Sequence, residues 1–245
     1  MTKRYMAMTL AEVLITIGII GVIGVMTVPS LVQDFREKTT VVTLKKTYST
    51  LSQAYTLAVA ENGTPDNWDL ITYYDSQGAL NMLAKFIPYL KITKNCGTGQ
   101  GCFPALPYPA LHTTTTQVRN LNDDTGISKV QLSDGVSIAF IVYNPICADP
   151  RGNSQALQNN CGLIYIDTNG LKNPNIIGKD LFVVYITKYG LIPFGSTLES
   201  GSSYPFSTEC LDHHGWGCAA WVLYNENMDY LHCNDLAWDG KTKCD

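Results

Sequence analysis

The chain has 245 residues, of which 45% are hydrophobic and 16% are charged, and its formal net charge is −4. This length suits one or two domains. Because the chain is acidic overall and has no cluster of five or more basic residues, it lacks the charge pattern typical of nucleic-acid-binding proteins.

The N-terminal region contains a long apolar run. No charged side chain occurs from Val13 to Val32, and as a helix such a run spans roughly 30 Å, the thickness of a bilayer core. Glu12 lies at the start of the run. A carboxylate is costly in hydrocarbon, so this position indicates either a partner or a function.

The first thirty residues combine this run with a small residue, Ala7, the segment Met8–Glu12 and an internal Pro29. The combination resembles the N-terminus of type IV pilins and of the pseudopilins of type II secretion. In that family a prepilin peptidase cuts after a small residue, usually Gly, and N-methylates the new first residue, usually Phe. The resemblance implies cleavage between Ala7 and Met8, with Glu12 as the family's glutamate at the fifth position and Pro29 as its proline. The chain departs from the pattern in having Ala before the cut and Met after it.

Two other interpretations of the N-terminal segment compete with this one. A secretory signal peptide predicts an Ala-x-Ala-like site after the apolar run, but residues 29–36 read Pro-Ser-Leu-Val-Gln-Asp-Phe-Arg, which is a poor site. An ordinary anchor helix explains neither Glu12 nor the small residue before Met8.

The resemblance divides the chain into a leader (1–7), a transmembrane and filament-core helix (8–33), and an amphipathic helix with a globular head (34–245). Lys3 and Arg4 favour a cytoplasmic N-terminus. The implied location is the bacterial inner membrane, crossed once with the head in the periplasm, and then a pilus or pseudopilus at the cell surface. The implied partners are the inner membrane, the prepilin peptidase, the assembly machinery and a homo- or hetero-filament of similar subunits.

Residues 9–61 are expected to form one long helix. Its first half is apolar on all sides, as in a helix surrounded by lipid or by similar helices. A kink or a locally melted turn is expected between Gly21 and Pro29. The second half carries apolar residues at intervals of three or four, which indicates packing on a globular core. These residues are Leu44, Tyr48, Leu51, Tyr55, Ala58 and Val59. Gly63 marks the end of the helix.

Beyond this helix, turn-rich segments alternate with short apolar runs. Short helices are expected over 79–90 and 218–231, a cysteine-tied loop over 95–112, and an exposed segment over 113–124. Strands are expected over Ser128–Leu132, Gly135–Tyr143, Cys161–Asp167, Leu181–Thr187 and Tyr189–Phe194, the last as a partner of the fourth. A sheet with one apolar face needs a covering layer, and the long helix supplies one. With the resemblance, these elements predict a pilin-like α+β fold with an antiparallel sheet.

Eight cysteines in a chain with an export-type N-terminus predict disulfides. Eight cysteines allow 105 pairings, and proximity in the sequence favours one set. That set pairs Cys96 with Cys102, Cys147 with Cys161, Cys210 with Cys218, and Cys233 with Cys244.

Two groups of residues are candidate metal-binding sites. Asp167, Asn169 and Asp180 lie in a stretch that resembles one in major pseudopilins, some of which bind calcium nearby, and oxygen ligands suit Ca²⁺. The alternative is a tight turn capped by Asp and Asn side chains. A zinc site can also be drawn through His213, His214 and the flanking cysteines, but in an oxidising compartment a disulfide between the cysteines is expected instead.

The predicted function is structural rather than enzymatic: a subunit polymerised through its N-terminal helix into a type IV pilus or a type II secretion pseudopilus. The alternative is a minor pilin or tip adhesin whose head binds a surface or a secreted substrate. A membrane-tethered enzyme has only the histidines and cysteines around residue 213 in its favour, with no recognisable nucleophile motif.

Overall fold

The computed structural model of the protein describes residues 9–113, 117–197 and 204–244. Ala7 and Met8, which flank the predicted cleavage site, lie outside the described residues. The chain divides into two compact units, Met1–Thr39 and Thr40–Asp245.

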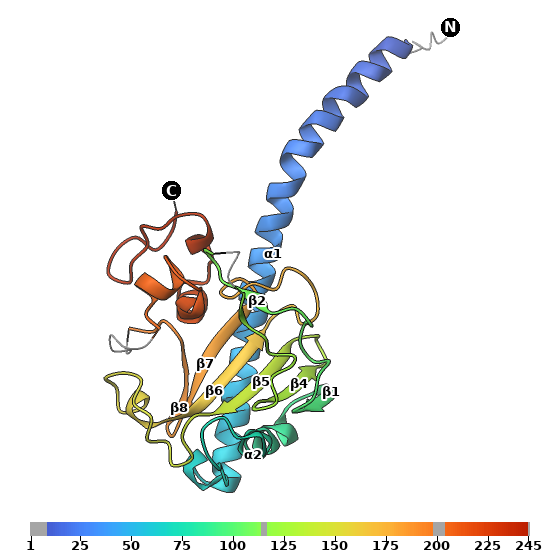
Figure 1. Ribbon diagram of the computed structural model, residues 1–245. Coiled ribbons are helices and arrows are strands. Elements are labelled where there is room, and N and C mark those ends of the chain that lie inside the picture. The colour runs from blue at the N-terminus through green and yellow to red at the C-terminus, as the bar shows by residue number, and fades with distance from the viewer. Residues whose placement is uncertain (1–8, 114–116, 198–203, 245) are drawn as a thin grey trace, which may run out of the picture. The chain divides into compact units, whose positions relative to one another are not determined.

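The helix α1 (Leu10–Asn62) contributes to both units (Figure 1). Every residue from Leu10 to Asn62 is helical, Pro29 included, so the locally melted turn predicted near this proline is absent. A single proline removes one backbone donor, and the neighbouring turns keep their own hydrogen bonds. The helix ends where predicted, because Gly63 has φ of 76° and donates its amide to the carbonyl oxygen of Val59 at 2.9 Å.

The second unit is built on a six-stranded antiparallel sheet, with the strand order β1-β4-β5-β6-β7-β8. The strands are β1 (Ile92–Gly97), β4 (Ser128–Leu132), β5 (Ser137–Val142), β6 (Asn160–Asp167), β7 (Leu181–Thr187) and β8 (Gly190–Pro193). A separate pair, β2 (Tyr108–Pro109) and β3 (Gln117–Arg119), lies between β1 and β4 in the sequence. The pairing of β8 with β7 confirms the sequence prediction, whereas β1 falls partly in a segment predicted to be a loop.

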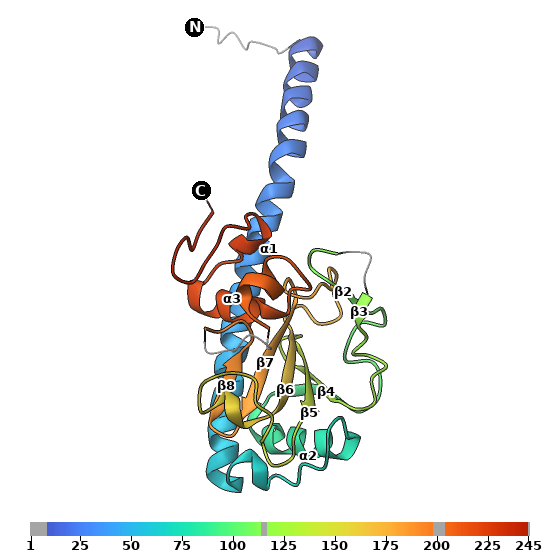
Figure 2. The same cartoon turned by 60° about the vertical axis from the view of Figure 1, so that its left-hand side comes forward.

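The two other α-helices among the described residues are short. They are α2 (Ser76–Phe86), which begins three residues earlier than predicted, and α3 (Ala219–Asn225), which is half the predicted length. Asp75 caps α2 by accepting a hydrogen bond from the Gly78 amide at 2.8 Å. Figure 2 shows the C-terminal segment with α3 beside the second half of α1, where Lys45 Nζ contacts Glu226 Oε1 at 2.5 Å.

Both faces of the sheet are buried, whereas the sequence led us to expect a covering layer on one face. One face packs against α1 and α2. This layer includes Leu44, Leu51, Tyr55, Met82, Phe86, Ile138, Phe140, Val142, Ile164 and Val184. The other face packs against loops and short turns. This layer includes Phe103, Tyr108, Leu121, Ile127, Ala139, Ile141, Leu163, Val183 and Phe194. Leu121 and Asn122 are buried, so the prediction that 113–124 is exposed was wrong for this part of it.

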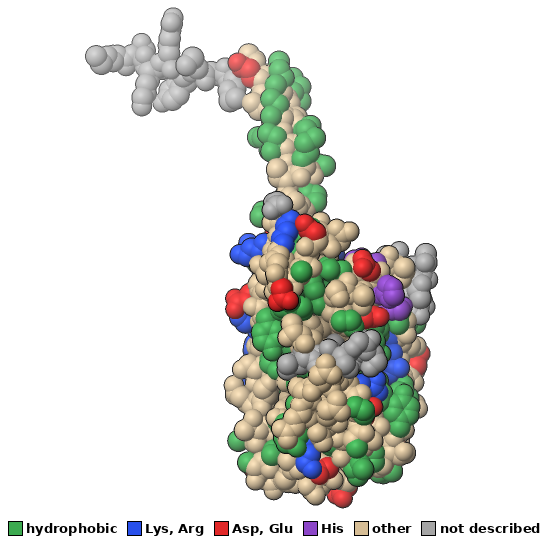
Figure 3. Space-filling model, turned by 90° about the vertical axis from the view of Figure 1, so that its left-hand side faces the viewer, with side chains coloured by type: hydrophobic (Ala, Val, Ile, Leu, Met, Phe, Trp, Pro, Cys, Tyr) green, Lys and Arg blue, Asp and Glu red, His purple; other side chains and the backbone are tan. Residues whose placement is uncertain are grey.

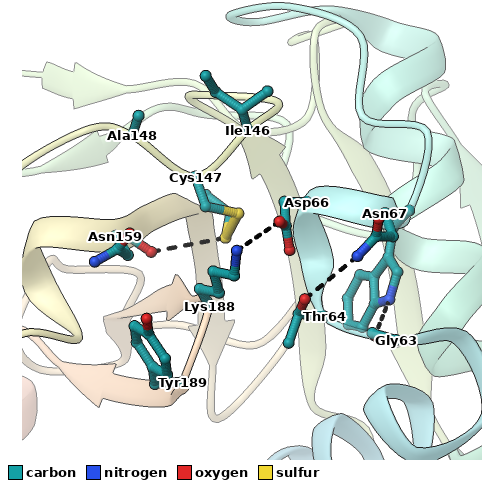
Figure 4. A network of polar contacts seen from close by, with 12 residues as sticks. Gly63, Thr64, Asp66, Asn67, Ile146, Cys147, Ala148, Asn159, Lys188 and Tyr189 are labelled. Atoms are coloured by element: carbon teal, nitrogen blue, oxygen red, sulfur yellow. Dashed lines mark hydrogen bonds and ion pairs between the residues drawn. A yellow bond between two sulfur atoms is a disulfide. The ribbon is translucent and has the colours of Figure 1, made fainter.

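A network of polar contacts fixes the turn that follows α1 against the sheet (Figure 4). Lys188 Nζ, at the end of β7, lies 2.6 Å from Asp66 Oδ2. The indole of Trp68 is fully buried and donates a hydrogen bond to the carbonyl oxygen of Gly63 at 2.8 Å. Tyr55 adds a bond from its hydroxyl to the carbonyl oxygen of Thr187 at 2.9 Å. The second half of α1 is thereby part of the head and not a free stalk.

All eight cysteines form disulfides, and their pairs are those favoured by sequence proximity. They are Cys96–Cys102, Cys147–Cys161, Cys210–Cys218 and Cys233–Cys244. Each bond closes a short loop, and two of the bonds attach their loops to the sheet through Cys96 in β1 and Cys161 in β6.

Candidate functional site

The apolar part of α1 begins with a capping box formed by Thr9 and Glu12. Glu12 Oε2 accepts hydrogen bonds from the Thr9 amide and the Thr9 hydroxyl, both at 2.8 Å. In return, Thr9 Oγ1 accepts a bond from the Glu12 amide at 3.3 Å. Thr9 is the N-cap and Glu12 the third helical residue, which is the spacing that this motif requires. Thr-x-x-Glu before an apolar run is the sequence signature of this motif, which was not among the features predicted above.

This cap uses one oxygen of the Glu12 carboxylate. Among the residues that the structure describes, Oε1 of Glu12 has no hydrogen-bond partner. Glu12 is exposed, as is almost every residue of the first unit that is described. The cap therefore holds one carboxylate oxygen of Glu12 and leaves the other open to a further hydrogen bond.

The side chains that follow Glu12 are apolar and exposed within their unit. They include Leu14, Ile15, Ile17, Ile19, Ile20, Val22, Ile23, Val25, Met26, Val28 and Leu31. Figure 3 shows apolar side chains covering the visible face of this segment, with a carboxylate at its start. By length and composition this part of α1 can span a membrane. Pro29, the other residue expected to matter for assembly, lies within this apolar helix.

Asp167, Asn169 and Asp180 lie close together, as the sequence predicts. Asp167 Oδ1 accepts bonds from the amides of Asn169 and Gly170 at 3.1 and 2.8 Å, and Oδ2 accepts one from the Tyr108 hydroxyl. Asn169 Nδ2 donates to Asp180 Oδ1 at 2.9 Å. Burial of Asp167 raises the pKa of its carboxyl to about 8. The cluster is the hydrogen-bonded centre of a tight turn.

Most of the side-chain oxygen atoms of this cluster already have hydrogen-bond partners within the protein. Both carboxylate oxygens of Asp167 and both of Asp180 already accept hydrogen bonds from the protein. Among the described residues, Asn169 Oδ1 and Asn175 Oδ1 are buried without a hydrogen-bond partner. Ca²⁺ takes six to eight oxygen ligands, and a calcium ion here stays a prediction. The alternative named from the sequence, a turn capped by Asp and Asn side chains, accounts for the contacts of these residues.

The region around residue 213 differs from the zinc site drawn from the sequence. Cys210 and Cys218 are joined in a disulfide, which removes both thiolates as ligands. Instead, Glu209 faces both histidines, with Oε1 at 3.6 Å from His213 Nδ1 and Oε2 at 3.7 Å from His214 Nδ1. Glu209 was not among the predicted site residues, although its position four residues before His213 is a signal that could have indicated it.

A model of a family of unknown function, DUF6613, matches residues 30–102, a region that includes the second half of α1, α2 and β1. This match covers less than half of the chain. No curated protein and no solved structure matches the chain significantly.

Proposed function

We propose that the protein is a prepilin-like subunit. It is cleaved after Ala7, N-methylated on Met8 and assembled through the apolar half of α1 into a type IV pilus or a type II secretion pseudopilus. The observation that supports this most is the apolar helix that is exposed on all sides and carries one carboxylate, Glu12, at its start. The α+β architecture, with half of a long helix packed on an antiparallel sheet, agrees with this proposal.

The exposed apolar side chains require a nonaqueous environment. An apolar surface of this extent is unfavourable in water, and lipid or a bundle of similar helices removes it from water. In the membrane before assembly, lipid covers it. In a filament, the same surface packs against neighbouring subunits, and the disulfide-tied heads face outward.

Glu12 then provides the register between subunits. A carboxylate in an apolar helix bundle is costly alone, and an ammonium group opposite it neutralises both charges. Cleavage after Ala7 creates an amine at Met8 that can supply this charge. Because the cap engages Oε2 and leaves Oε1 open, Glu12 can cap its own helix and accept a bond from a neighbour at the same time.

Two substitutions distinguish the helix-capping role of Glu12 from the role of its negative charge. Glu12→Gln keeps a side chain that can form the capping box but carries no charge, whereas Glu12→Ala loses both. The readout is the fraction of the protein recovered in sheared filaments rather than in the inner membrane of the native cells. We expect both variants to accumulate in the membrane and to be depleted from filaments. Normal assembly of Glu12→Gln, with a defect only in Glu12→Ala, would leave Glu12 a helix cap and remove its role between subunits.

One observation favours the alternative role of a minor pilin or tip adhesin. A groove of about 740 Å³ lies between the 100–109 loop and the 171–176 loop of the head. It is lined by prolines and by the exposed side chains of Leu106 and Leu171. A tip subunit is present in far fewer copies than a major one. Quantitative mass spectrometry of sheared filaments therefore distinguishes the two roles: a trace amount beside an abundant second pilin supports the tip role.

A further inference from the structure

Three side chains with metal-binding atoms meet on the surface of the head: Glu209, His213 and His214. Their ligand atoms all lie within 4.8 Å of one another. The carboxylate of Glu209 lies 3.6 Å from one imidazole nitrogen and 3.7 Å from the other. In a tetrahedral site with zinc bonds of about 2.0–2.1 Å, neighbouring ligand atoms are about 3.3 Å apart. The carboxylate–imidazole distances exceed that separation by about 0.3–0.4 Å, so side-chain rotations are needed to close the site around an ion.

The backbone around the three residues is fixed. The disulfide Cys210–Cys218 closes the loop that carries both histidines. The residue 111–112 segment pairs with this loop, since the Leu111 amide donates to the carbonyl oxygen of His214 at 2.9 Å and the His112 amide to that of His213 at 3.3 Å. The Gly215 amide also donates to the carbonyl oxygen of Glu209 at 2.6 Å. The positions of the three side chains are therefore set by the fold before any ligand binds.

Glu209 has an unsatisfied polar atom that points to a cation. Its Oε2 is buried and, within the part of the chain that the structure describes, has no hydrogen-bond partner, with His214 Nδ1 at 3.7 Å. Native proteins rarely leave a buried oxygen in this state. The two histidines are more open, with 61% of the His213 side chain and 40% of the His214 side chain exposed. A metal ion bound to Glu209 and the two histidines would have its remaining coordination positions open toward solvent. Figure 3 shows histidine side chains at the surface of the head next to acidic groups.

We propose that Glu209, His213 and His214 form a binding site for a divalent transition-metal ion such as Zn²⁺. Two imidazoles and one carboxylate suit zinc and its neighbours rather than calcium or magnesium. Three protein ligands leave at least one position for water or for a ligand atom of another molecule. The third histidine of the region, His112, is not part of the set, because its Nε2 lies 2.7 Å from the carbonyl oxygen of Cys210. The site belongs to the head and does not depend on the proposed role of α1.

The experiment uses the full chain in detergent, without a polyhistidine tag, with disulfides intact and metal removed by EDTA and dialysis. Isothermal titration with ZnCl₂ should give one saturable site, and CaCl₂ should give none. Glu209→Gln, His213→Ala and His214→Ala should each weaken zinc binding at least about tenfold. His232→Ala, which removes an exposed histidine outside the cluster, should bind zinc as the unchanged chain does. Titration with Co²⁺ should give the visible absorption of an ordered low-coordinate site, and lose it in Glu209→Gln.

The main alternative is that Glu209 forms one ion pair with each of the two histidines and that no metal binds. The absence of saturable zinc binding would establish that alternative and overturn the proposal. So would zinc binding that survives Glu209→Gln, or that weakens equally in His232→Ala, because surface histidines would then bind zinc without a built site. The three ligand variants should keep the circular dichroism spectrum of the unchanged chain, since two of the side chains are exposed and the third change preserves shape.

Discussion

The ammonium group of Lys129 lies 2.8 Å from the backbone carbonyl oxygen of Asn122, inside the head. It also donates to the carbonyl oxygens of Leu121 at 3.2 Å and Asp124 at 2.7 Å. Lys129 is fully buried, and burial lowers the pKa of its side chain. A lysine of β4 thus holds the loop that covers the second face of the sheet.

Lys129→Met should therefore destabilise the head, because three carbonyl oxygens lose their donor while the side chain keeps a similar size. We expect the free energy of unfolding to fall by at least about 2 kcal/mol. Urea denaturation followed by tryptophan fluorescence measures it. Lys172→Met is the matched control, since Lys172 is exposed, and it should be neutral. Equal stability of the two variants would show that the lysine does not support the loop.

Asp167 should make the stability of the head depend on pH. Its native pKa of about 8 lies above the ordinary value of 3.8, so between these values the native state binds more protons than the unfolded state. The free energy of unfolding therefore falls as pH rises from about 4 to about 8. Asp167→Asn keeps an acceptor for the two backbone amides and has no proton to lose.

From pH 5 to pH 8.5, in EDTA, the unchanged chain should lose at least about 2 kcal/mol more stability than Asp167→Asn. Asp239→Asn removes an exposed carboxylate and should keep the pH dependence of the unchanged chain. If the curves for Asp167→Asn and the unchanged chain run parallel, Asp167 ionises in the native head with an ordinary pKa.

The turn after β6 should not tolerate a side chain at Gly170. This residue has φ of +63°, and a Cβ there would lie 2.2 Å from the backbone carbonyl oxygen of Gly135. Gly170→Ala should therefore lower the free energy of unfolding by at least about 2 kcal/mol. Gly240→Ala is the control, because its Cβ would lie at an ordinary 3.6 Å from Ala237 Cβ. A thermal midpoint unchanged by Gly170→Ala would mean that the β4–β5 turn moves aside at little cost.

Much of the fold could be predicted from the sequence where local patterns decide it. The bounds of β4 and β7 agree with the prediction. The run in β7 is dense in β-branched and aromatic residues, whereas the end of β4 is marked by the turn residues Ser133, Asp134 and Gly135 that follow it. The long helix ends at its predicted glycine. The four disulfides follow sequence proximity, since each joins cysteines within 14 residues of one another.

Features that depend on tertiary context could not be predicted in this way. The strand β1 has a weakly apolar sequence, Ile-Thr-Lys-Asn-Cys-Gly, and becomes a strand because β4 offers it an edge. The burial of Lys129 depends on a loop that folds over it, which no local pattern reveals. The approach of Glu209 to two histidines depends on a tight turn closed by a disulfide. The continuous apolar sequence of β7, however, indicates that both faces of the sheet are covered.

If the protein is processed as proposed, Met8 becomes the first residue of a membrane-inserted subunit. Mass spectrometry of the N-terminus of the protein purified from its native membrane tests this directly. We expect a first residue of Met8 bearing one methyl group on its amine. An intact Met1, or a first residue beyond Val32, would contradict it and would leave an anchored or secreted disulfide-rich domain.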